Sequence, residues 1–435
     1  MSGLRADGFP AEAVRARARR GPAAAFPDVE DYGHALFGAG TVSGAGTAFG
    51  ASTVQERDPL DAARLTPPVF VPERLEKLIE LAREPLHSDV DLRTTVGGFA
   101  SALPLYVSAF GSTQVAGTGL GRAVGAQAGA LGVPMVIGEN VAPVNGSGRL
   151  CDDVTSGLLG RVRAYADTVP DGVGGVVIQQ STEDADAEVW NLVYSDPSAR
   201  PLLDSGRLAL ELKVGQGAKP GLGGLTVVDS SQAARLAEQF VVEPVFDAAT
   251  GRLLRCASPG TFTEEVLRQQ IRLMRNNYPR ARVWVKLPPG RDVGHAAGIA
   301  WAAGADAVTV DGAEGGSGWA PRAFLSGVGL PLSECLRRIG TPEGCLLVSG
   351  RMWEGTRAVK CLALGARAVG LGRAALLAAD EDPEAGLTRL VECLALEMRM
   401  LVSALGKYRV DTLCGDDLWV PSEPQVPDAA PARVG

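Results

Sequence analysis

The chain has 435 residues, enough for one large barrel of about 250 residues with additions or for two or three smaller domains. Its net charge of −8 gives no basic surface for nucleic acid or for an anionic membrane, and no apolar stretch reaches about 18 residues. We therefore expect a cytoplasmic protein that binds neither. The seven cysteines contain no Cys-x-x-Cys pair, so we also expect no disulfide framework, metal site or iron–sulfur cluster.

The N-terminal part of the chain differs in composition from the rest. Residues 1–65 are rich in Ala, Gly, Pro and Arg, and they contain no Gly-x-Gly-x-x-Gly between a strand and a helix. We expect this extension to wrap the surface and to be partly disordered. A segment with helical periodicity from Pro72 to Leu81 leads into a domain predicted at residues 66–420. The Pro-rich residues 421–435 are expected to be a disordered tail.

Eight short apolar runs, separated by helical segments, predict the fold. Runs rich in Val, Leu and Ile are typical of strands buried on both faces, and a helix between successive strands makes a sheet parallel. The fold class is therefore α/β, a (β/α)8 TIM barrel with an N-terminal extension and a C-terminal helix. The runs are Leu105–Gly111, Pro134–Asn140, Gly175–Ser181, Leu208–Val214, Val283–Leu287, Ala307–Gly312, Leu346–Gly350 and Ala368–Arg373.

Two connections are longer than simple turns. They cover Glu183–Gly206 and Gly215–Thr261, and loops of this length in a compact domain are usually lids or binding loops. Thr263 has the features of a helix N-cap, because two glutamates follow it in the first turn. Pro383–Leu405 has the apolar spacing of one long amphipathic helix, which we expect to cover the barrel or a partner subunit.

The carboxyl ends of the strands, where a TIM barrel carries its chemistry, are rich in glycine and polar residues. Ser349-Gly350-Arg351 and Gly370-Leu-Gly372-Arg373 end strands seven and eight, each just before a helix. Backbone N–H groups and a helix N-terminus at such ends would bind a phosphate. Lys286, at the end of strand five, would face the ring of a cofactor held there. This combination suggests FMN.

Longer motifs resemble a known family. Lys213-Val-Gly-Gln-Gly-Ala-Lys-Pro-Gly-Leu-Gly-Gly224, Val285-Lys-Leu287, Asp311–Pro321 and the Gly-Arg strand ends are similar to the FMN-binding synthase domain of glutamate synthase and its stand-alone relatives. The resemblance runs from about Leu65 to Leu418. It implies an FMN-dependent oxidoreductase acting on CH–NH2 donors: ammonia adds to 2-oxoglutarate, and reduced FMN passes a hydride to the imine.

The resemblance also implies roles for particular residues. Lys286 matches the family lysine beside flavin and substrate, where a cation would stabilise a reduced ring or orient a carboxylate. Glu139 matches the glutamate of the family's Thr-Gly-Glu-Gly-Gly strand end. The catalytic candidates are Lys286, Glu139 and Gln216; the cofactor-binding candidates are Ser108, Gln179, Lys286, Gly316, Gly350, Arg351, Gly372 and Arg373; the substrate-binding candidates are Lys219, Glu314 and Ser317.

Each of these assignments has a purely structural alternative. Lys286 would be a lysine that extends from a strand end to solvent, and Glu139 would accept hydrogen bonds from loop N–H groups. Arg351 and Arg373 would form surface ion pairs. Gln216 and Lys219 would line the pocket or stabilise their own loop.

The sequence departs from the family at several points. Ser108-Ala109 stands where the family has Met-Ser, and Ser258-Pro-Gly-Thr-Phe262 stands where it has Pro-Pro-His-His-Asp. The three-cysteine run that holds a 3Fe-4S cluster in full-length glutamate synthases is absent from the sequence. Residue 2 is Ser, and we expect no glutaminase nucleophile in this chain. We therefore expect a small amino or oxo acid as substrate, a separate amidotransferase or reductase subunit as partner, and a homo-oligomer.

Three alternatives remain open. The first is an amine transferase like N-methylglutamate synthase, which uses the same domain with methylamine. The second is a hydroxy-acid oxidase, but that family needs a histidine base after strand six, where this chain has Glu314-Gly-Gly316. The third is a non-catalytic barrel subunit of a biosynthetic complex.

Overall fold

The computed structural model describes most of the barrel and parts of both termini. The described residues are 4, 6, 8–26, 58–70, 83–110, 118–138, 152–182, 188–215, 217, 225–230, 233–234, 237–238, 240–245, 247–256, 262–315 and 322–421. The predicted helix at Pro72–Leu81 and the predicted tail beyond Pro421 lie outside them.

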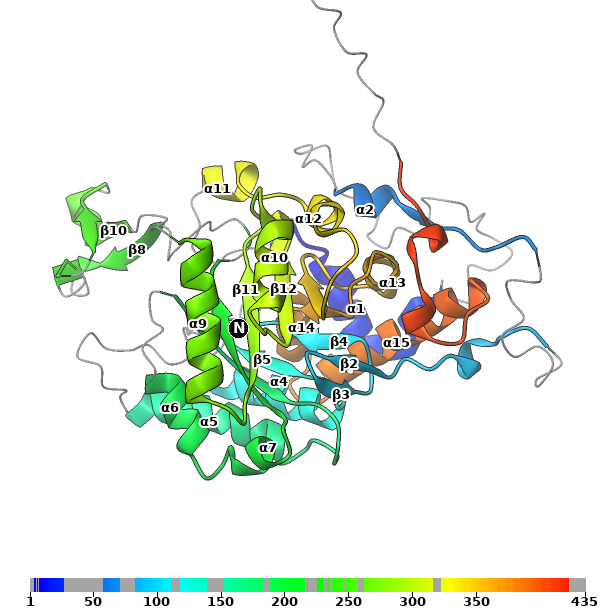
Figure 1. Ribbon diagram of the computed structural model, residues 1–435, viewed down its shortest axis with the longest axis horizontal. Helices are drawn as coiled ribbons and strands as arrows, with labels where there is room; N and C mark the ends of the chain where they lie inside the picture. The colour runs from blue at the N-terminus through cyan, green and yellow to red at the C-terminus, as the bar shows by residue number, and fades with distance from the viewer. Residues whose placement is uncertain are drawn as a thin grey trace, which may run out of the picture.

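Eight parallel strands close into a barrel (Figure 1). They follow one another around the ring in the order in which they occur in the sequence, and the last strand pairs with the first. The predicted TIM barrel is therefore confirmed. The strands are β4 (Leu105–Val107), β5 (Met135–Ile137), β6 (Val176–Ser181), β7 (Leu208–Lys213), β11 (Arg282–Leu287), β12 (Ala307–Asp311), β13 (Leu346–Ser349) and β14 (Ala368–Leu371).

Helices between the strands cover the outside of the barrel. Thr263 caps α9, because its hydroxyl accepts a hydrogen bond from Val266 N at 3.2 Å, as the sequence predicts. Within the described part of the chain, no helix is long and apolar enough to cross a membrane. The helices are α4 (Thr118–Ala130), α5 (Asp152–Ala166), α9 (Glu264–Asn277), α10 (Val293–Ala302), α11 (Arg322–Gly327), α12 (Leu332–Ile339), α13 (Gly355–Ala363), α14 (Arg373–Glu381) and α15 (Gly386–Ala404).

A short hairpin closes the amino-terminal end of the barrel. It consists of β2 (Thr94–Val96) and β3 (Phe99–Ser101), which pair antiparallel. Trp284 in the barrel interior donates a hydrogen bond to Gly97 O at 3.0 Å and packs on Phe99 with ring centroids 5.6 Å apart. A side chain at Gly97 would lie 2.1 Å from the Trp284 ring, so this close approach requires glycine. The hairpin makes this end of the barrel a packed apolar core.

The two long connections are not simple loops. The first contains α6 (Glu188–Ser195) and α7 (Arg200–Asp204), and Trp190 in α6 donates a hydrogen bond to Ile178 O of β6 at 3.1 Å. The second contains an antiparallel sheet in the order β8-β10-β9, seen to the side of the barrel in Figure 1. Its strands are β8 (Leu225–Asp229), β9 (Val241–Glu243) and β10 (Arg252–Cys256). The expectation of lids therefore does not describe the first connection, because its helices pack on the barrel.

The described parts of the first 65 residues are attached to the barrel. Helix α1 (Ala11–Arg20) packs against α14 and α15, and Arg15 forms ion pairs with Asp380 at 2.7 Å and Glu381 at 2.9 Å. Farther along, α2 (Pro59–Ala62) contacts α12 and α13, and β1 (Arg64–Leu65) pairs with β15 (Leu418–Trp419). The C-terminal helix α15 packs against α1, α13 and α14.

Candidate functional site

The interior of the barrel changes from apolar to polar along its strands. Side chains alternate along a strand, so each strand places successive residues of one face in successive layers of the interior. The apolar layer consists of Tyr106, Val136, Val177, Ala209, Trp284, Ala307, Leu347 and Ala368. Nearer the carboxyl ends is a polar layer that consists of Ser108, Gln179, Glu211, Lys286, Thr309, Asp311 and Ser349, all buried. We call this second set the polar layer.

Lys286 occupies the polar layer with its charge balanced. Its Nζ lies 3.0 Å from Oδ2 of Asp311 on the neighbouring strand, and Oδ1 of Asp311 accepts a hydrogen bond from the hydroxyl of Ser349. A buried ion pair is stable only when further hydrogen bonds satisfy its polar atoms, and Ser349 provides one of these. Asp311 therefore links β11, β12 and β13 at the mouth of the barrel.

Glu211 is a second buried carboxylate in the polar layer. Its Oε2 accepts a hydrogen bond from Gln179 Nε2 at 2.5 Å, and its Oε1 accepts one from Thr309 Oγ1 at 2.6 Å. Burial raises the pKa of Glu211, and the Lys286 ammonium acts in the opposite direction. Gln179 is a predicted site residue, whereas Glu211, Thr309 and Asp311 are not. Their signal in the sequence is a polar side chain at every second position of an otherwise apolar strand.

Ser108 and Tyr106 lie against a glycine of β14. A side chain at Gly370 would lie 2.0 Å from Ser108 Oγ and 2.6 Å from the Tyr106 ring, so glycine makes room for both. Burial, with the Asp311 and Glu211 carboxylates, raises the pKa of Tyr106 well above its usual value. The phenol therefore stays neutral. Ser108 Oγ is buried and has no hydrogen-bond partner among the residues that the structure describes.

The glycines at the ends of β13 and β14 differ in their surroundings. Gly350 has φ 140°, and a side chain there would lie 3.3 Å from Gly312 N, so the backbone after β13 is closely packed. Gly372 directly precedes α14, and among the described residues the nearest atom to a side chain placed there is Ser108 Cβ at 4.0 Å. The first N–H groups of a helix have no partner within the helix. The space beside Gly372 is therefore suited to an anion.

The two arginines that follow these glycines are engaged by the protein. Arg351, at φ 54°, forms an ion pair with Asp61 at 2.8 Å. Arg373 donates a hydrogen bond to Glu314 O at 2.6 Å, and its guanidinium lies 4.6 Å from the centre of the Phe9 ring. Burial and the nearby Arg351 lower the pKa of Arg373. The alternative that these arginines form ion pairs therefore holds for Arg351, which pairs with Asp61. Arg373 instead binds a backbone carbonyl and is buried.

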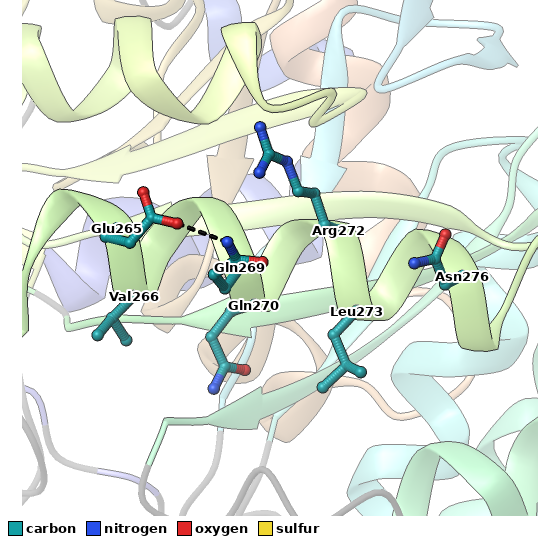
Figure 2. A pocket seen from close by; sticks show the side chains of 7 residues that line it. All are labelled: Glu265, Val266, Gln269, Gln270, Arg272, Leu273 and Asn276. Atoms are coloured by element: carbon teal, nitrogen blue, oxygen red, sulfur yellow. Dashed lines mark hydrogen bonds between the residues drawn. The ribbon is translucent and has the colours of Figure 1, made fainter.

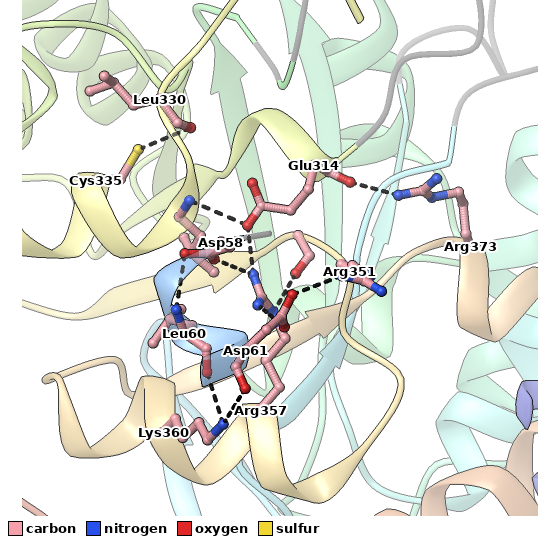
Figure 3. Close-up of polar contacts among 12 residues, drawn as sticks. Asp58, Leu60, Asp61, Glu314, Leu330, Cys335, Arg351, Arg357, Lys360 and Arg373 are labelled. Atoms are coloured by element: carbon pink, nitrogen blue, oxygen red, sulfur yellow. Dashed lines mark hydrogen bonds and ion pairs between the residues drawn. The ribbon is translucent and has the colours of Figure 1, made fainter. Parts of the chain in front are cut away.

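A buried arginine joins the N-terminal segment to this end of the barrel (Figure 3). Arg357 in α13 contacts Asp58 at 2.6 Å, Asp61 at 2.9 Å and Glu314 at 2.6 Å, and donates to Gly350 O at 3.1 Å. We call these four charged residues the Arg357 cluster. Its signal in the sequence is an arginine, with Lys360 three residues later, in a largely apolar helix, but the distant carboxylates cannot be paired with it by spacing.

Charges within the Arg357 cluster shift one another. Burial raises the pKa of Glu314 to about 7, with Arg357 opposing the shift and Asp58 adding to it. For Asp58, burial is the largest single influence and acts to raise the pKa, but Arg357 together with hydrogen bonds to Glu314 and Ser333 lowers it overall. Glu314 also accepts a hydrogen bond from Leu332 N at 3.3 Å. The carboxylate of this predicted substrate residue is thus directed into the cluster.

Five predicted site residues lie outside the described residues. They are Glu139, Gln216, Lys219, Gly316 and Ser317. The structure brings the remaining candidates to the carboxyl-terminal end of one barrel: Ser108, Gln179, Lys286, Glu314, Gly350, Arg351, Gly372 and Arg373.

A separate hollow of about 470 Å³ lies on α9 (Figure 2). Its lining comes from one exposed side of that helix, where the Leu273 side chain is among the exposed apolar ones. None of the predicted site residues that the structure describes lines it. The hollow is lined by Glu265, Val266, Gln269, Gln270, Arg272, Leu273 and Asn276.

One region of the chain, which contains most of the candidate site residues, is similar to a known protein family. Residues 202–381 match the family described as the conserved region in glutamate synthase. The chain is glutamate synthase-like. The match begins just before β7 and ends with α14. It therefore contains Lys286, Asp311 and Arg357, and the glycines that follow β13 and β14. It covers less than half of the chain.

Several curated proteins are similar to the glutamate synthase-like chain over part of their length. An archaeal-type glutamate synthase [NADPH] of Dehalococcoides mccartyi is 27% identical over 254 residues, which are 50% of this chain and 50% of that protein. A glutamate synthase large subunit-like protein of Rhizobium meliloti is 34% identical over 185 residues, or 40% of each chain. These matches thus span half of the relative or less.

Solved structures share the fold. A soluble mutant of the membrane-associated (S)-mandelate dehydrogenase from Pseudomonas putida has a TM-score of 0.53 at 21% identity, covering 95% of this chain and 100% of that one. A flavocytochrome b2 mutant with pyruvate bound has a TM-score of 0.52 at 18% identity, covering 84% and 78%. At this identity the likeness concerns the barrel alone.

Proposed function

We propose that the glutamate synthase-like chain is an FMN-dependent oxidoreductase acting on CH–NH2 donors, which reduces the imine formed from an oxo acid and ammonia or an amine. The observation that carries this proposal is the buried Lys286–Asp311 pair at 3.0 Å, because it puts a lysine inside the mouth of a glutamate synthase-like barrel. Solvent-exposed lysines need no such partner. The glycine ends of β13 and β14 stand across the same mouth.

The residues present fit FMN. The open space at Gly372, next to the N-terminus of α14, suits its phosphate, and the buried Ser108 Oγ has capacity for another hydrogen bond. Gly350, Arg351, Gly372 and Arg373 would hold the phosphate end, while Ser108, Gln179, Lys286 and Gly316 would line the ring. Bound FMN would supply the hydride.

Substrate binding would use the charge of Lys286. An ammonium in a water-poor mouth orients a carboxylate strongly, because the low dielectric increases their attraction. Asp311 holds this ammonium in place. We propose Glu139 and Gln216 as further catalytic residues and Lys219 and Ser317 as substrate contacts. The Glu314 carboxylate is paired with Arg357. Glu314 would therefore hold the loop after β12 in place more than it would contact the oxo acid substrate.

The organisation of the whole protein is also a proposal. We propose residues 66–420 as one barrel domain, residues 1–65 as an extension and residues 421–435 as a tail. A separate amidotransferase or reductase subunit would supply ammonia or electrons to a cytoplasmic homo-oligomer. The identity of the amine separates a glutamate-forming enzyme from one like N-methylglutamate synthase, and a barrel without flavin would be a non-catalytic subunit.

A matched pair of variants at Gly372 tests the flavin assignment. Gly372→Asp would place a carboxylate beside the phosphate, whereas Gly372→Asn adds a side chain of the same size without the charge. Because both side chains enter open space, both variants should fold. We expect the purified Asp variant to lose most of its FMN and the Asn variant to keep clearly more. Full flavin content in a folded Asp variant would disprove this phosphate site.

A further inference from the structure

Gln179 and Glu211 are direct neighbours across two barrel strands. They are register partners of β6 and β7, and both side chains face the interior. Gln179 Nε2 donates a hydrogen bond to Glu211 Oε2 at 2.5 Å. The relative exposure of the two residues is 2% and 1%, so water does not compete for this bond.

The chemistry of the pair fixes which way the amide points. An ionised carboxylate has acceptors only, whereas an amide has a donor end and an acceptor end. The NH2 group of Gln179 must therefore face Glu211, and its carbonyl oxygen Oε1 must face away from Glu211. None of the described residues donates a hydrogen bond to that oxygen. The pair with Glu211 therefore directs this acceptor away from the carboxylate.

Thr309 supports the ionised form of Glu211. Its hydroxyl lies 2.6 Å from Glu211 Oε1 and 3.4 Å from Val285 O, and its single proton favours the nearer, charged acceptor. The charged groups that face Glu211 from other strands are Lys286 and Asp311, and Tyr106 is the nearby phenol. Lys286 favours the carboxylate, while burial and Asp311 oppose it.

We propose that Glu211 is a positioning residue: it holds the Gln179 amide with its carbonyl oxygen available in the barrel mouth, so that the site selects a ring that presents an N–H group. This inference rests on the proposed flavin function. The flavin ring carries one such group, at N3. Glu211 would act through Gln179 without touching the ring itself.

Binding of two flavins tests the proposal without an activity assay. Protein freed of its flavin is titrated with FMN and with N3-methyl-FMN, which lacks the N–H group. We expect the native chain to prefer FMN by about tenfold, the effect of one buried hydrogen bond left unmade. In Glu211→Gln, residue 211 offers either end of an amide, so Gln179 is free to turn over. The preference should then fall to about twofold or less.

Two further variants keep the test decisive. Gln179→Met removes the acceptor and should abolish the preference even if Glu211→Gln fails to fold. Asp306→Asn alters a carboxylate at the opposite end of the barrel, where it accepts from Val283 N at 2.7 Å, and should keep the preference. A native preference that survives in folded Glu211→Gln or Gln179→Met overturns the inference, as does equal native affinity for both flavins. A native chain that binds neither flavin overturns the proposed function instead.

Discussion

The ammonium of Lys286 and the carboxylate of Asp311 lie 3.0 Å apart, with side chains only 7% and 8% exposed. Both charges are removed from water, so each depends on the other. Loss of Lys286 leaves the buried Asp311 carboxylate without its cation, and loss of Asp311 removes the carboxylate nearest to Lys286. Variants at both positions can therefore distinguish the effect of Lys286 on stability from its effect on the rate of the reaction.

Lys286→Met should therefore destabilise the fold by about 3 kcal/mol, because Asp311 remains buried without its partner. The double variant Lys286→Met/Asp311→Asn should recover only part of that loss, because Glu211 still lacks the Lys286 ammonium. It should not recover the rate of flavin reoxidation, which we expect to fall on the order of 100-fold. Urea unfolding and rapid-mixing absorbance measure the two effects.

Lys360→Met is the matched control for Lys286. Lys360 is equally buried, at 6% exposure for both residues, but its Nζ donates to Leu60 O at 2.8 Å in the N-terminal segment. Its loss should lower stability and leave flavin reoxidation within about twofold of the native rate. Equal rates in the Lys286 variants and the native chain would remove Lys286 from the mechanism.

Arg357 is predicted to be a main attachment of the N-terminal segment. Arg357→Met would leave Asp58, Asp61 and Glu314 without their shared cation, which should cost about 3–5 kcal/mol of unfolding free energy. Arg337→Met is the comparison, because the 71% exposed Arg337 pairs with Glu334 at the surface, where solvent screens the pair, and its loss should change stability far less. Similar losses in the two urea titrations would contradict a central role for the cluster.

Glu314 should make stability depend on pH. Its pKa is about 7 in the folded chain, above its ordinary value of 4.5, so the folded state binds more protons between these values. Stability from this group is therefore fully present below about pH 4.5 and is lost as pH rises to about 7, by up to about 3 kcal/mol. Glu314→Gln should lose less stability between pH 5 and pH 8 than the native chain, by about 2 kcal/mol in urea unfolding. Parallel losses in both chains would show that Glu314 titrates normally.

Gly370 should tolerate no side chain. The new methyl group of Gly370→Ala would lie 2.0 Å from Ser108 Oγ and 2.6 Å from Tyr106, so β4 or β14 must move at a cost of about 3 kcal/mol. Gly372→Ala, two residues away on the same side, enters open space and should leave the thermal unfolding midpoint nearly unchanged. Equal thermal unfolding midpoints for the two variants would mean that the strands around Gly370 can accept a side chain without loss of stability.

The barrel could be predicted from the sequence because each strand is a local signal. Val283–Leu287, for example, is apolar, short and followed by a helix, and it became β11 with Lys286 at its end. The long helix predicted at Pro383–Leu405 is α15, Gly386–Ala404, within the usual uncertainty of helix ends. Buried runs and amphipathic helices need no knowledge of distant partners.

The pairing of polar residues could not be predicted in the same way. Asp58 and Arg357 are 299 residues apart, and only the packing of the N-terminal segment on α13 brings their side chains within 2.6 Å. Glu211 and Thr309 are 98 residues apart in the sequence, and the closed barrel brings their side chains into hydrogen-bond contact. The α6 and α7 helices were missed because they are short and follow a stretch without clear periodicity. The sequence shows which side chains lie at strand ends, but it does not show which carboxylates hold them.

The most direct test of the proposed function is an anaerobic reoxidation experiment on the purified chain. Its bound flavin is reduced by light and then mixed with an oxo acid alone, with ammonia or methylamine alone, or with both together, while flavin absorbance and amino acid formation are followed. We predict rapid reoxidation only when acid and amine are both present, with one amino acid formed per flavin. A chain that carries no flavin, or whose reduced flavin is unaffected by every combination of acid and amine, would contradict the account.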